Sequence, residues 1–477
     1  MKHQKRICLS LILYCSKKGC LIQCHFTALK RKGVIMHKNK HWNSSLGFIL
    51  ASAGSAIGLG AIWKFPYIAG QYGGGAFLIQ FILFTLLIGL PLLIVEFYIG
   101  HAGKTFSLTI FSKLSGSKFM DLIGLWGNIA AFILYAFYSV IGGWIILFIG
   151  YYLGIIFNVF ELQLDYFQQM IANPLLSVLG ALLFIMLTEV IVSFGIQNGI
   201  ERASKIMMPL LFLLFLIIVG RALMLEGAIE GLKYFLIPRF EDLSIEGTLY
   251  AMGQSFFALS LGTTGMITYA SYTKDDTNVI QSALWIVIMN LLISILAGLA
   301  IFPAASALNI EVEAGPGLLF LVLPKLFEKM TFGFGFYMLF LILFLFAALT
   351  SSISLLELNL SNLIKNNEDK RKKYALLLSL AVFITSIFPA LSFGIYKDFK
   401  FGAGTIFDNM DFLVSNIMMP LGVLFTTLFC GFVLDKQLLF SIFTRNSQHS
   451  KLFTLWYTLI KYILPIVIII VFVTQLI

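Results

Sequence analysis

The sequence predicts an all-α polytopic membrane protein. We expect eleven transmembrane helices, arranged as two inverted five-helix repeats with broken helices 1 and 6, plus one extra C-terminal helix. Of its 477 residues 59% are hydrophobic and 12% are charged, and the mean hydropathy is +0.93, whereas soluble domains carry about 25% charged residues. The apolar runs are continuous, which excludes an outer-membrane barrel, because its strands alternate apolar and polar residues. Two of the runs contain glycine clusters.

Charge-poor runs mark the spans, since a helix needs about 20 apolar residues to cross a bilayer. The expected helices, in chain order, are 46–67, 75–100, 121–153, 175–194, 200–221, 247–271, 278–304, 331–364, 374–393, 411–434 and 453–475.

The loops between these helices predict the orientation, because Lys and Arg are enriched in cytoplasmic loops. With the N-terminus inside, the inner loops hold fourteen Lys and Arg residues and the outer loops hold seven. The N-terminus is therefore expected in the cytoplasm. The odd number of helices then places the C-terminus outside.

The formal net charge of +10 comes mostly from residues 1–35, which hold eight Lys or Arg and no acid. No basic face spans the rest of the chain, so we expect no nucleic-acid partner. This segment also holds four of the five cysteines, but their spacing does not match a zinc site, and its apolar stretch is short for a signal peptide. Two interpretations stay open. Either Met36 is the true start and residues 1–35 are not translated, or they form a disordered cytoplasmic tail.

The glycine clusters at 53–60 and 259–265 fall inside helices 1 and 6. Each interior glycine costs about 1 kcal/mol relative to alanine. Close packing through small residues would explain one cluster, but two clusters five spans apart favour two repeats that each open with a broken helix. Unwound backbone is tolerated in a bilayer only where it lines a cavity. Half-helix N-termini attract anions and unwound carbonyls attract cations, which predicts a midplane site for a carboxylate and Na⁺.

Hydroxyl groups at Thr350, Ser351 and Ser352 interrupt the apolar helix 8. Such hydroxyls often bond to carbonyls of their own helix. Beside unwound carbonyls they would instead be hard oxygen ligands for a small cation.

Seven sequence strings then occur in a fixed order, and together they are a specific signal. They are SAGSAIGLGAIWKFPYIAGQYGGGAF, FYSVIGGW, SFFALSLGTTGMITYASY, LAGLAIFP, AGPGLLFLVLPKLF, LTSSISLLE and MDFLVSNIMMPLG. From about Trp42 to the end, the chain resembles the neurotransmitter:sodium symporter family in its bacterial eleven-helix form. The resemblance implies one transporter domain over residues 36–477, with helices 1–5 at about 46–221, helices 6–10 at about 247–434 and helix 11 at about 453–475.

The resemblance also implies a function. It implies a sodium-coupled symporter of the bacterial inner (plasma) membrane that imports a neutral, medium-to-large apolar amino acid by alternating access, as a monomer or weak homodimer. The alternative is a proton-coupled or sodium-independent amino-acid carrier on the same scaffold. A membrane enzyme is not expected, since no H-E-x-x-H or G-x-S-x-G motif occurs and all six histidines lie outside the spans or at their ends.

Site residues follow from the resemblance, position by position. The implied substrate-binding residues are Ser55, Ala56, Gly58, Leu59, Gly60, Leu134, Tyr138, Phe257, Ser260, Thr263 and Leu355. The implied second sodium site is Gly54, Ile57, Ala347, Thr350 and Ser351, and the first is Ala56, Ala258 and Asn290. The implied gates are Lys64 with Asp411 on the outer side and Trp42 with Tyr272 on the inner side. Gly199 and Pro209 would let helix 5 unwind.

Some positions depart from the family pattern. Ala61 and Ala258 stand where the first sodium site usually has side-chain oxygens, so coupling to a single sodium ion is an open alternative. Chloride use is open too. Ser294 stands where chloride-independent members often carry a carboxylate, whereas Phe81 and Ala258 stand where chloride-dependent members carry hydroxyls. Gly58 replaces the aspartate of monoamine carriers and leaves room for a substrate that brings its own carboxylate.

Charged residues depart as well. On the inner side, Asn39 stands where the family usually has an arginine, and Lys365 stands where helix 8 of the family usually has an aspartate. Carboxylates inside membrane spans are functional candidates by default. Glu96 and Glu189 lie near helix ends, where solvated or hydrogen-bonded roles are expected. Glu357 is a candidate proton carrier.

Overall fold

The computed structural model describes residues 41–161, 163, 166–308, 320, 332–365, 367–445 and 450–476. Over these residues the chain is helical, and the β-type pairing is an isolated bridge between Phe401 and Gly404. The two interpretations of residues 1–35, and the departure at Asn39, lie outside the described residues.

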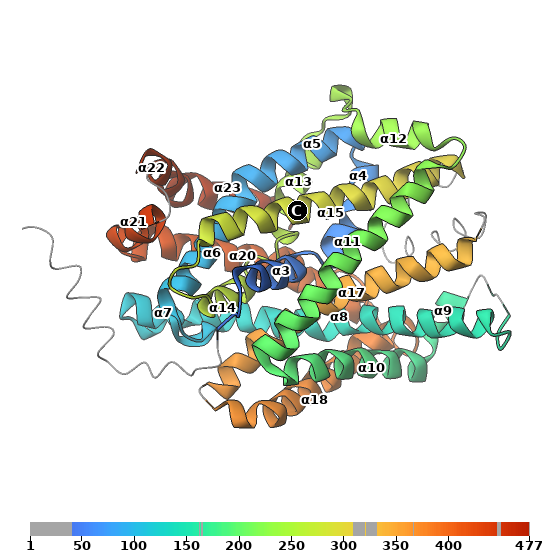
Figure 1. Cartoon of the computed structure of the whole chain (residues 1–477), viewed down its shortest axis with the longest axis horizontal. Coiled ribbons are helices and arrows are strands. Elements are labelled where there is room, and N and C mark those ends of the chain that lie inside the picture. The colour runs from blue at the N-terminus through green and yellow to red at the C-terminus, as the bar shows by residue number, and fades with distance from the viewer. Residues whose placement is uncertain are drawn as a thin grey trace, which may run out of the picture. The chain divides into compact units, whose positions relative to one another are not determined.

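Figure 1 shows the described helices in chain order. They are α3 (Ser45–Ala56), α4 (Phe65–Gln71), α5 (Gly75–Phe84), α6 (Leu90–Gly103), α7 (Ser107–Ser115), α8 (Asp121–Ile156), α9 (Tyr166–Ala172), α10 (Pro174–Ser193), α11 (Arg202–Leu223), α12 (Ala228–Leu236), α13 (Ile245–Phe257), α14 (Gly265–Ser271), α15 (Val279–Ala307), α17 (Gly333–Ile364), α18 (Arg371–Ala390), α19 (Ile406–Phe412), α20 (Met419–Leu428), α21 (Lys436–Arg445), α22 (Ser450–Thr458) and α23 (Leu464–Thr474).

Short π-helical and 3₁₀ segments adjoin many of these α-helices. The π-helical segments are Gly60–Lys64, Thr85–Gly89, Ile196–Glu201, Leu413–Met418, Phe429–Val433 and Leu459–Ile463, and the 3₁₀ turns are Lys118–Met120, Phe240–Asp242, Glu368–Lys370 and Leu391–Phe393.

Nine helices in the described part of the chain are long and apolar enough to cross a membrane. A tenth candidate is the pair Ser45–Ala56 and Gly60–Gln71, which is bent by 55° at its break. The sixth expected span consists of α13 and α14, each of which is too short to cross alone. The all-helical polytopic fold is therefore confirmed, whereas the count of eleven and the inverted repeats stay predictions.

Polar caps start the long helices where the sequence expected them to start. The Ser44 hydroxyl accepts the backbone N–H of Gly47 at 3.0 Å and begins α3, and Asn278 accepts that of Gln281 at the start of α15. Asn173 caps α10, whose first residue is Pro174. Each cap satisfies a backbone donor that the first helical turn leaves free, so these ends agree with the expected boundaries to within a few residues.

The break in helix 6 needs unusual backbone conformations. Ser260 and Thr264 have positive φ angles of 54° and 61°, and Gly262 has 86°. L-residues rarely adopt such angles. Gly262 also lies so close to α20 that an added Cβ would collide with the carbonyl of Met419. Close packing therefore holds residues 258–264 out of helical geometry.

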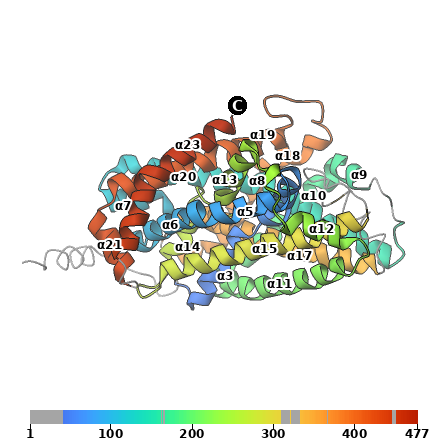
Figure 2. The same ribbon diagram turned by 90° about the horizontal axis from the view of Figure 1, so that it is seen from above.

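The two breaks face each other inside the bundle. The long α8 packs against α10 and α17, while α14 packs against α6 and α3. Figures 1 and 2 both show α3 and α14 side by side, with α17 close to α8. Segments distant in sequence thus bring unwound backbone from helices 1 and 6 next to helices 3 and 8.

Candidate functional site

A cavity of about 280 Å³ lies at the two helix breaks. Its wall contains every residue that the sequence proposed for substrate binding. It is also lined by Ser351, Lys64 and Asp411, which the sequence assigned to the second sodium site and the outer gate. The proposed substrate-binding residues come from α3, α8, α13, α17 and the segments at the two breaks, and Asp411 comes from α19 (Ile406–Phe412). The fold therefore gathers into one place residues as distant in sequence as Ser55 and Asp411.

One part of the cavity wall is polar. The Tyr138 hydroxyl is buried and makes no well-formed hydrogen bond to any residue that the structure describes, so it is available to a bound molecule. An added Cβ on Gly58 would lie 3.0 Å from that hydroxyl oxygen and still closer to the Ser351 hydroxyl. The Ser260 hydroxyl donates to the Ser55 carbonyl at 2.9 Å and links the two broken helices. A glycine at 58 thus keeps room beside unwound backbone and a free hydroxyl.

The rest of the wall is largely apolar. Leu134, Phe257 and Leu355 line it, as expected from the sequence. The structure adds lining residues that sequence reasoning did not name: Trp63, Tyr67, Phe137, Ile141, Ser354, Phe393, Phe407, Asp408 and Met419. Most of these are aromatic or aliphatic side chains inside apolar runs, where nothing local distinguishes a cavity-facing residue from a lipid-facing one.

Oxygen atoms of helices 1 and 8 meet beside the cavity. The Ser351 hydroxyl lies 3.2 Å from the carbonyl oxygens of both Gly54 and Ser55. The Thr350 hydroxyl lies 3.1 Å from the Ala347 carbonyl oxygen. Ser351 thus joins helix 8 to helix 1, whereas the Thr350 hydroxyl bonds within its own helix, also to the Phe346 carbonyl at 3.0 Å. Hydroxyl and carbonyl oxygens of this kind are the hard ligands that such cations prefer.

Asn290 supplies a free oxygen near the helix 6 break. Its amide nitrogen donates to the Ala258 carbonyl at 2.9 Å, while its buried Oδ1 atom has no hydrogen-bond donor in the described part of the chain. A buried acceptor without a donor costs free energy, and a bound cation would remove that cost. Ala61 and Ala258 are fully buried and add no side-chain oxygen, so the first site has fewer ligands than the second.

Comparison with known proteins identifies this arrangement. A model of the sodium:neurotransmitter symporter family matches residues 39–164 and 159–477. The chain belongs to this family. An uncharacterized sodium-dependent transporter of Bacillus subtilis is 44% identical over 91% of this chain and 97% of its own length. A second, from Haemophilus influenzae, is 33% identical over 91% of this chain and 98% of its own length.

The solved structures agree with the sequence matches. The crystal structure of MhsT in complex with L-phenylalanine has a TM-score of 0.83 and 36% identity, and the match covers 92% of this chain and all of that one. The sodium-dependent neutral amino acid transporter B(0)AT2 of Bos taurus is 28% identical over 55% of this chain. The protein is thus a multi-pass membrane symporter for a small molecule, with Na⁺ as its co-substrate.

The two residues expected at the outer gate of this symporter do not pair in the structure. Lys64 Nζ lies 4.3 Å from the ring centroid of Phe257, and Asp411 accepts a hydrogen bond of 2.7 Å from Ser415. Both side chains line the cavity. The cavity also reaches Asp408, which is exposed. In this conformation the gate charges are therefore apart, and the ammonium lies on the aromatic ring expected over the substrate.

Trp42 and Tyr272 lie together, as the resemblance implied for the inner gate. The Trp42 indole N–H donates to the Tyr269 carbonyl at 2.9 Å, and the Trp42 backbone N–H donates to the Tyr272 carbonyl at 3.2 Å. Both side chains are buried. The N-terminal end of α3 is thereby held against the C-terminal end of α14.

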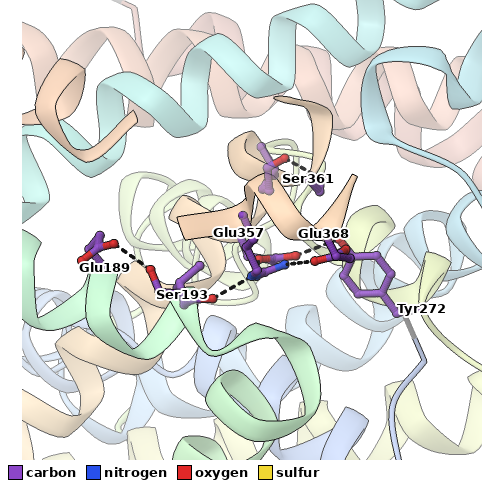
Figure 3. Close-up of polar contacts among 9 residues, drawn as sticks. Glu189, Ser193, Tyr272, Glu357, Ser361 and Glu368 are labelled. Atoms are coloured by element: carbon purple, nitrogen blue, oxygen red, sulfur yellow. Dashed lines mark hydrogen bonds and ion pairs between the residues drawn. The ribbon is translucent and has the colours of Figure 1, made fainter. Parts of the chain in front are cut away.

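Charges on the inner side are arranged differently from the expectation. Arg371, one of the fourteen Lys and Arg residues counted in the inner loops, is buried and forms an ion pair with Glu357. The Tyr272 hydroxyl donates to the same carboxylate at 2.9 Å, and Arg371 also approaches Glu368 at 3.4 Å. Figure 3 shows Tyr272 and Glu368 next to Glu357. The basic segment 370–373 thus contributes one buried residue, Arg371, because the buried Glu357 carboxylate needs a partner.

Helix 5 is tied to the start of helix 1 by Glu201, a residue that the sequence did not single out. The Glu201 carboxylate accepts from the Asn43 backbone N–H at 2.8 Å and from the Ser44 hydroxyl at 3.1 Å, and it pairs with Lys205 at 2.6 Å. Gly199 lies in the π-helical segment Ile196–Glu201, and Pro209 lies within α11. The predicted unwinding segment is thus directly attached to α3.

The remaining intramembrane carboxylates have hydrogen-bond donors. Glu96 accepts from the Gly262 backbone N–H at 2.7 Å and thereby supports the helix 6 break. Glu189 accepts from Ser193 at 2.6 Å, as Figure 3 shows. Near the predicted chloride position, Phe81 packs on Phe65 and the Ser294 hydroxyl donates to its own helix at the Asn290 carbonyl.

Proposed function

We propose that the symporter imports a neutral amino acid with a medium-to-large apolar side chain, driven by the sodium gradient, through alternating access. The observation that carries this proposal is the cavity at the two helix breaks, which has one polar and one apolar region. The Tyr138 hydroxyl and the amides of Leu59 and Gly60 would bind the substrate carboxylate. The carbonyls near Ala56, Phe257 and Ser260 would bind its amine.

The charges around the cavity support a neutral side chain. Lys64, Asp408 and Asp411 line it, but Asp408 is engaged in the cap of α19, where Thr405 donates to it at 2.7 Å, and Asp411 accepts from Ser415. The apolar region formed by Leu134, Phe257 and Leu355 offers no partner to a charged side chain, and an unpaired charge there is costly. The phenylalanine complex of MhsT and the neutral amino acid specificity named for B(0)AT2 point to the same class.

Sodium would bind at two places of unequal strength. The second site would use the carbonyls of Gly54, Ile57 and Ala347 with the hydroxyls of Thr350 and Ser351. The first site would use carbonyls near Ala56 and Ala258 with the free oxygen of Asn290. Because the protein offers fewer side-chain oxygens at the first site, we propose that the second site dominates coupling.

Alternating access would follow from the difference between the two ends of the cavity. On one side the gate charges Lys64 and Asp411 are apart. On the other, Trp42, Tyr272 and the Arg371–Glu357 pair are buried together. This combination supports an outward-facing conformation that closes when Lys64 and Asp411 meet and the inner contacts break.

We also propose a position in the bacterial plasma membrane, with the N-terminus in the cytoplasm and the C-terminus outside, since Lys and Arg are more frequent in the loops on the N-terminal side. A cysteine introduced at Gln475 would then react with a membrane-impermeant thiol reagent in intact cells. One introduced at Lys274 would react only after permeabilisation. The reverse pattern would overturn the orientation.

Uptake tests the substrate proposal. Purified protein in proteoliposomes is given a panel of radiolabelled amino acids with either Na⁺ or choline outside. Sodium-dependent uptake of large neutral amino acids, inhibited by their apolar analogues, is expected. Uptake restricted to cationic or dicarboxylic amino acids would contradict the proposed cavity chemistry.

A further inference from the structure

A second cavity lies far from the substrate site, in the connection between the last two spans. It has a volume of about 320 Å³ and is lined by Lys436, Gln437, Phe440, Lys451, Phe453 and Thr454. These residues belong to α21 and α22, which contact each other and lie together at one end of the helices in Figure 1.

Aromatic packing holds the two helices around this cavity. Phe443, Phe453 and Trp456 are buried, and the Phe453 ring lies 5.4 Å from Phe443 and 5.1 Å from Phe440 between centroids. The cavity is therefore part of a packed structure rather than a gap between independent helices.

Three lysines gather at this corner. Lys436 and Lys451 line the same cavity, and Lys436 Nζ lies 5.1 Å from the ring centroid of Tyr457. Lys461 Nζ lies 5.6 Å from the same ring. Among the described residues, no carboxylate lies within ion-pair distance of these ammonium groups. Asp435 accepts the Gln437 backbone N–H at 2.8 Å, as a cap of α21. The positive charge at this corner has no acidic partner in the described chain.

The surroundings are apolar and exposed. Phe440 is 40% exposed, Leu455 64% and Phe432 57%, and they lie on or beside the ends of membrane-spanning helices. A site with ammonium groups next to exposed apolar side chains matches a ligand that carries both an anionic head and hydrocarbon chains. Lysines at helix ends reach the membrane surface in this way, and anionic lipids attract basic residues there.

We propose that this cavity binds the phosphate headgroup of an anionic phospholipid, held between Lys436 and Lys451, with its acyl chains along the exposed apolar side chains of α21 and α22. The single negative charge of the phosphodiester reduces the repulsion between the two like charges that line one cavity. Gln437 and Thr454 are the polar neighbours of the headgroup, while Lys461 adds positive charge from the adjacent span.

Native mass spectrometry tests this proposal. The full-length protein is purified from mixed micelles of phosphatidylglycerol and phosphatidylcholine, and the retained lipids are counted as the ratio of the two is varied. The wild type is expected to retain phosphatidylglycerol in preference to phosphatidylcholine. Each lysine near a membrane surface contributes about 1 kcal/mol, or roughly 5-fold in affinity, so K436Q/K451Q is expected to weaken phosphatidylglycerol binding roughly 25-fold.

Two variants separate the site from general surface charge. K372Q/K373Q removes two exposed lysines at the start of α18 and is expected to retain phosphatidylglycerol as the wild type does. K436R/K451R keeps the positive charge and is expected to retain it too, which shows that loss in K436Q/K451Q is not caused by misfolding. Equal retention by K436Q/K451Q and the wild type would overturn the proposal, as would equal losses in both glutamine pairs.

Inorganic phosphate distinguishes a lipid from a free anion. At millimolar concentration it is expected to leave the retained phosphatidylglycerol in place, because the acyl chains contribute to binding. Displacement of the lipid by phosphate would mean that the cavity binds soluble anions, and the lipid assignment would be wrong.

Discussion

Arg371 and Glu357 form a buried ion pair that joins α18 to α17 on the same side of the protein as Trp42 and Tyr272. The guanidinium also donates to the Val192 carbonyl at 2.8 Å, at the end of α10. Three helices and the end of α14 therefore meet at one pair of charges.

Arg371→Gln is expected to destabilise the protein strongly. It leaves the Glu357 carboxylate buried without its cation, and breaking a buried pair from one side costs about 3–5 kcal/mol. Glu357→Gln with Arg371→Gln removes both charges and should recover most of the loss. Thermal unfolding in detergent compares the stability of the wild type, Arg371→Gln and the double variant. The control is Arg239→Gln, which breaks the exposed pair with Asp242 and should cost under about 1 kcal/mol. Equal destabilisation by Arg371→Gln and by the double variant would contradict this reasoning.

Tyr138→Phe is expected to weaken substrate binding without lowering stability. The hydroxyl has no partner among the described residues, so the protein loses no internal hydrogen bond. A hydrogen bond to a charged carboxylate contributes about 1.5–3 kcal/mol, which corresponds to roughly 10- to 100-fold in apparent affinity. The apparent affinities of the wild type and the variant are compared by binding of the radiolabelled substrate in detergent.

Tyr135→Phe is the matched control for this prediction. Its hydroxyl, on α8, is also buried and has no hydrogen-bond partner among the residues that the structure describes, but it does not line the cavity. If both variants lose affinity equally, the effect of Tyr138 is not contact with the substrate.

Lys64 and Asp411 are expected to pair during transport although they are apart here. Reversing either charge alone should reduce uptake, because like charges would then meet at the outer end of the cavity. Lys64→Asp combined with Asp411→Lys should restore part of the loss. Uptake rates at equal membrane levels are compared, and the absence of any recovery would mean that the two residues never meet.

Much of the substrate cavity could be predicted from sequence because its determinants are local. Gly58 and Gly262 lie in the unwound segments, while glycines at 54, 60 and 265 lie in the helical elements beside them. The resemblance assigned the neighbouring lining residues. The Arg371–Glu357 pair could not be predicted in this way. Arg371 lies in a basic run that is typical of a solvated loop, and only the packing of α10, α17 and α18 buries it.

Glu201 was missed for the same physical reason. It opens a helix beside Lys205, which is the usual pattern of a surface pair. Its main role in the structure is to accept hydrogen bonds from Asn43 and Ser44, 158 and 157 residues earlier. The short helices α7, α9, α12 and α21 were also not predicted, because two or three turns give too few repeats of the helical period to stand out from loop sequence.

The two sodium sites are expected to respond unequally to mutation. Thr350→Ala with Ser351→Ala removes both side-chain oxygens from the second site. Each contact to a cation is comparable to a charged hydrogen bond of about 1.5–3 kcal/mol, so sodium affinity should fall by roughly 10²-fold or more. Asn290→Ala should have a smaller effect, because the first site already has alanines at 61 and 258. Ala61→Asn should raise sodium affinity or steepen the sodium dependence.

The test measures the uptake rate as a function of Na⁺ concentration for the wild type and the three variants. A wild-type Hill coefficient near two, with Asn290→Ala as damaging as the double variant, would show that the first site is intact despite its missing oxygens.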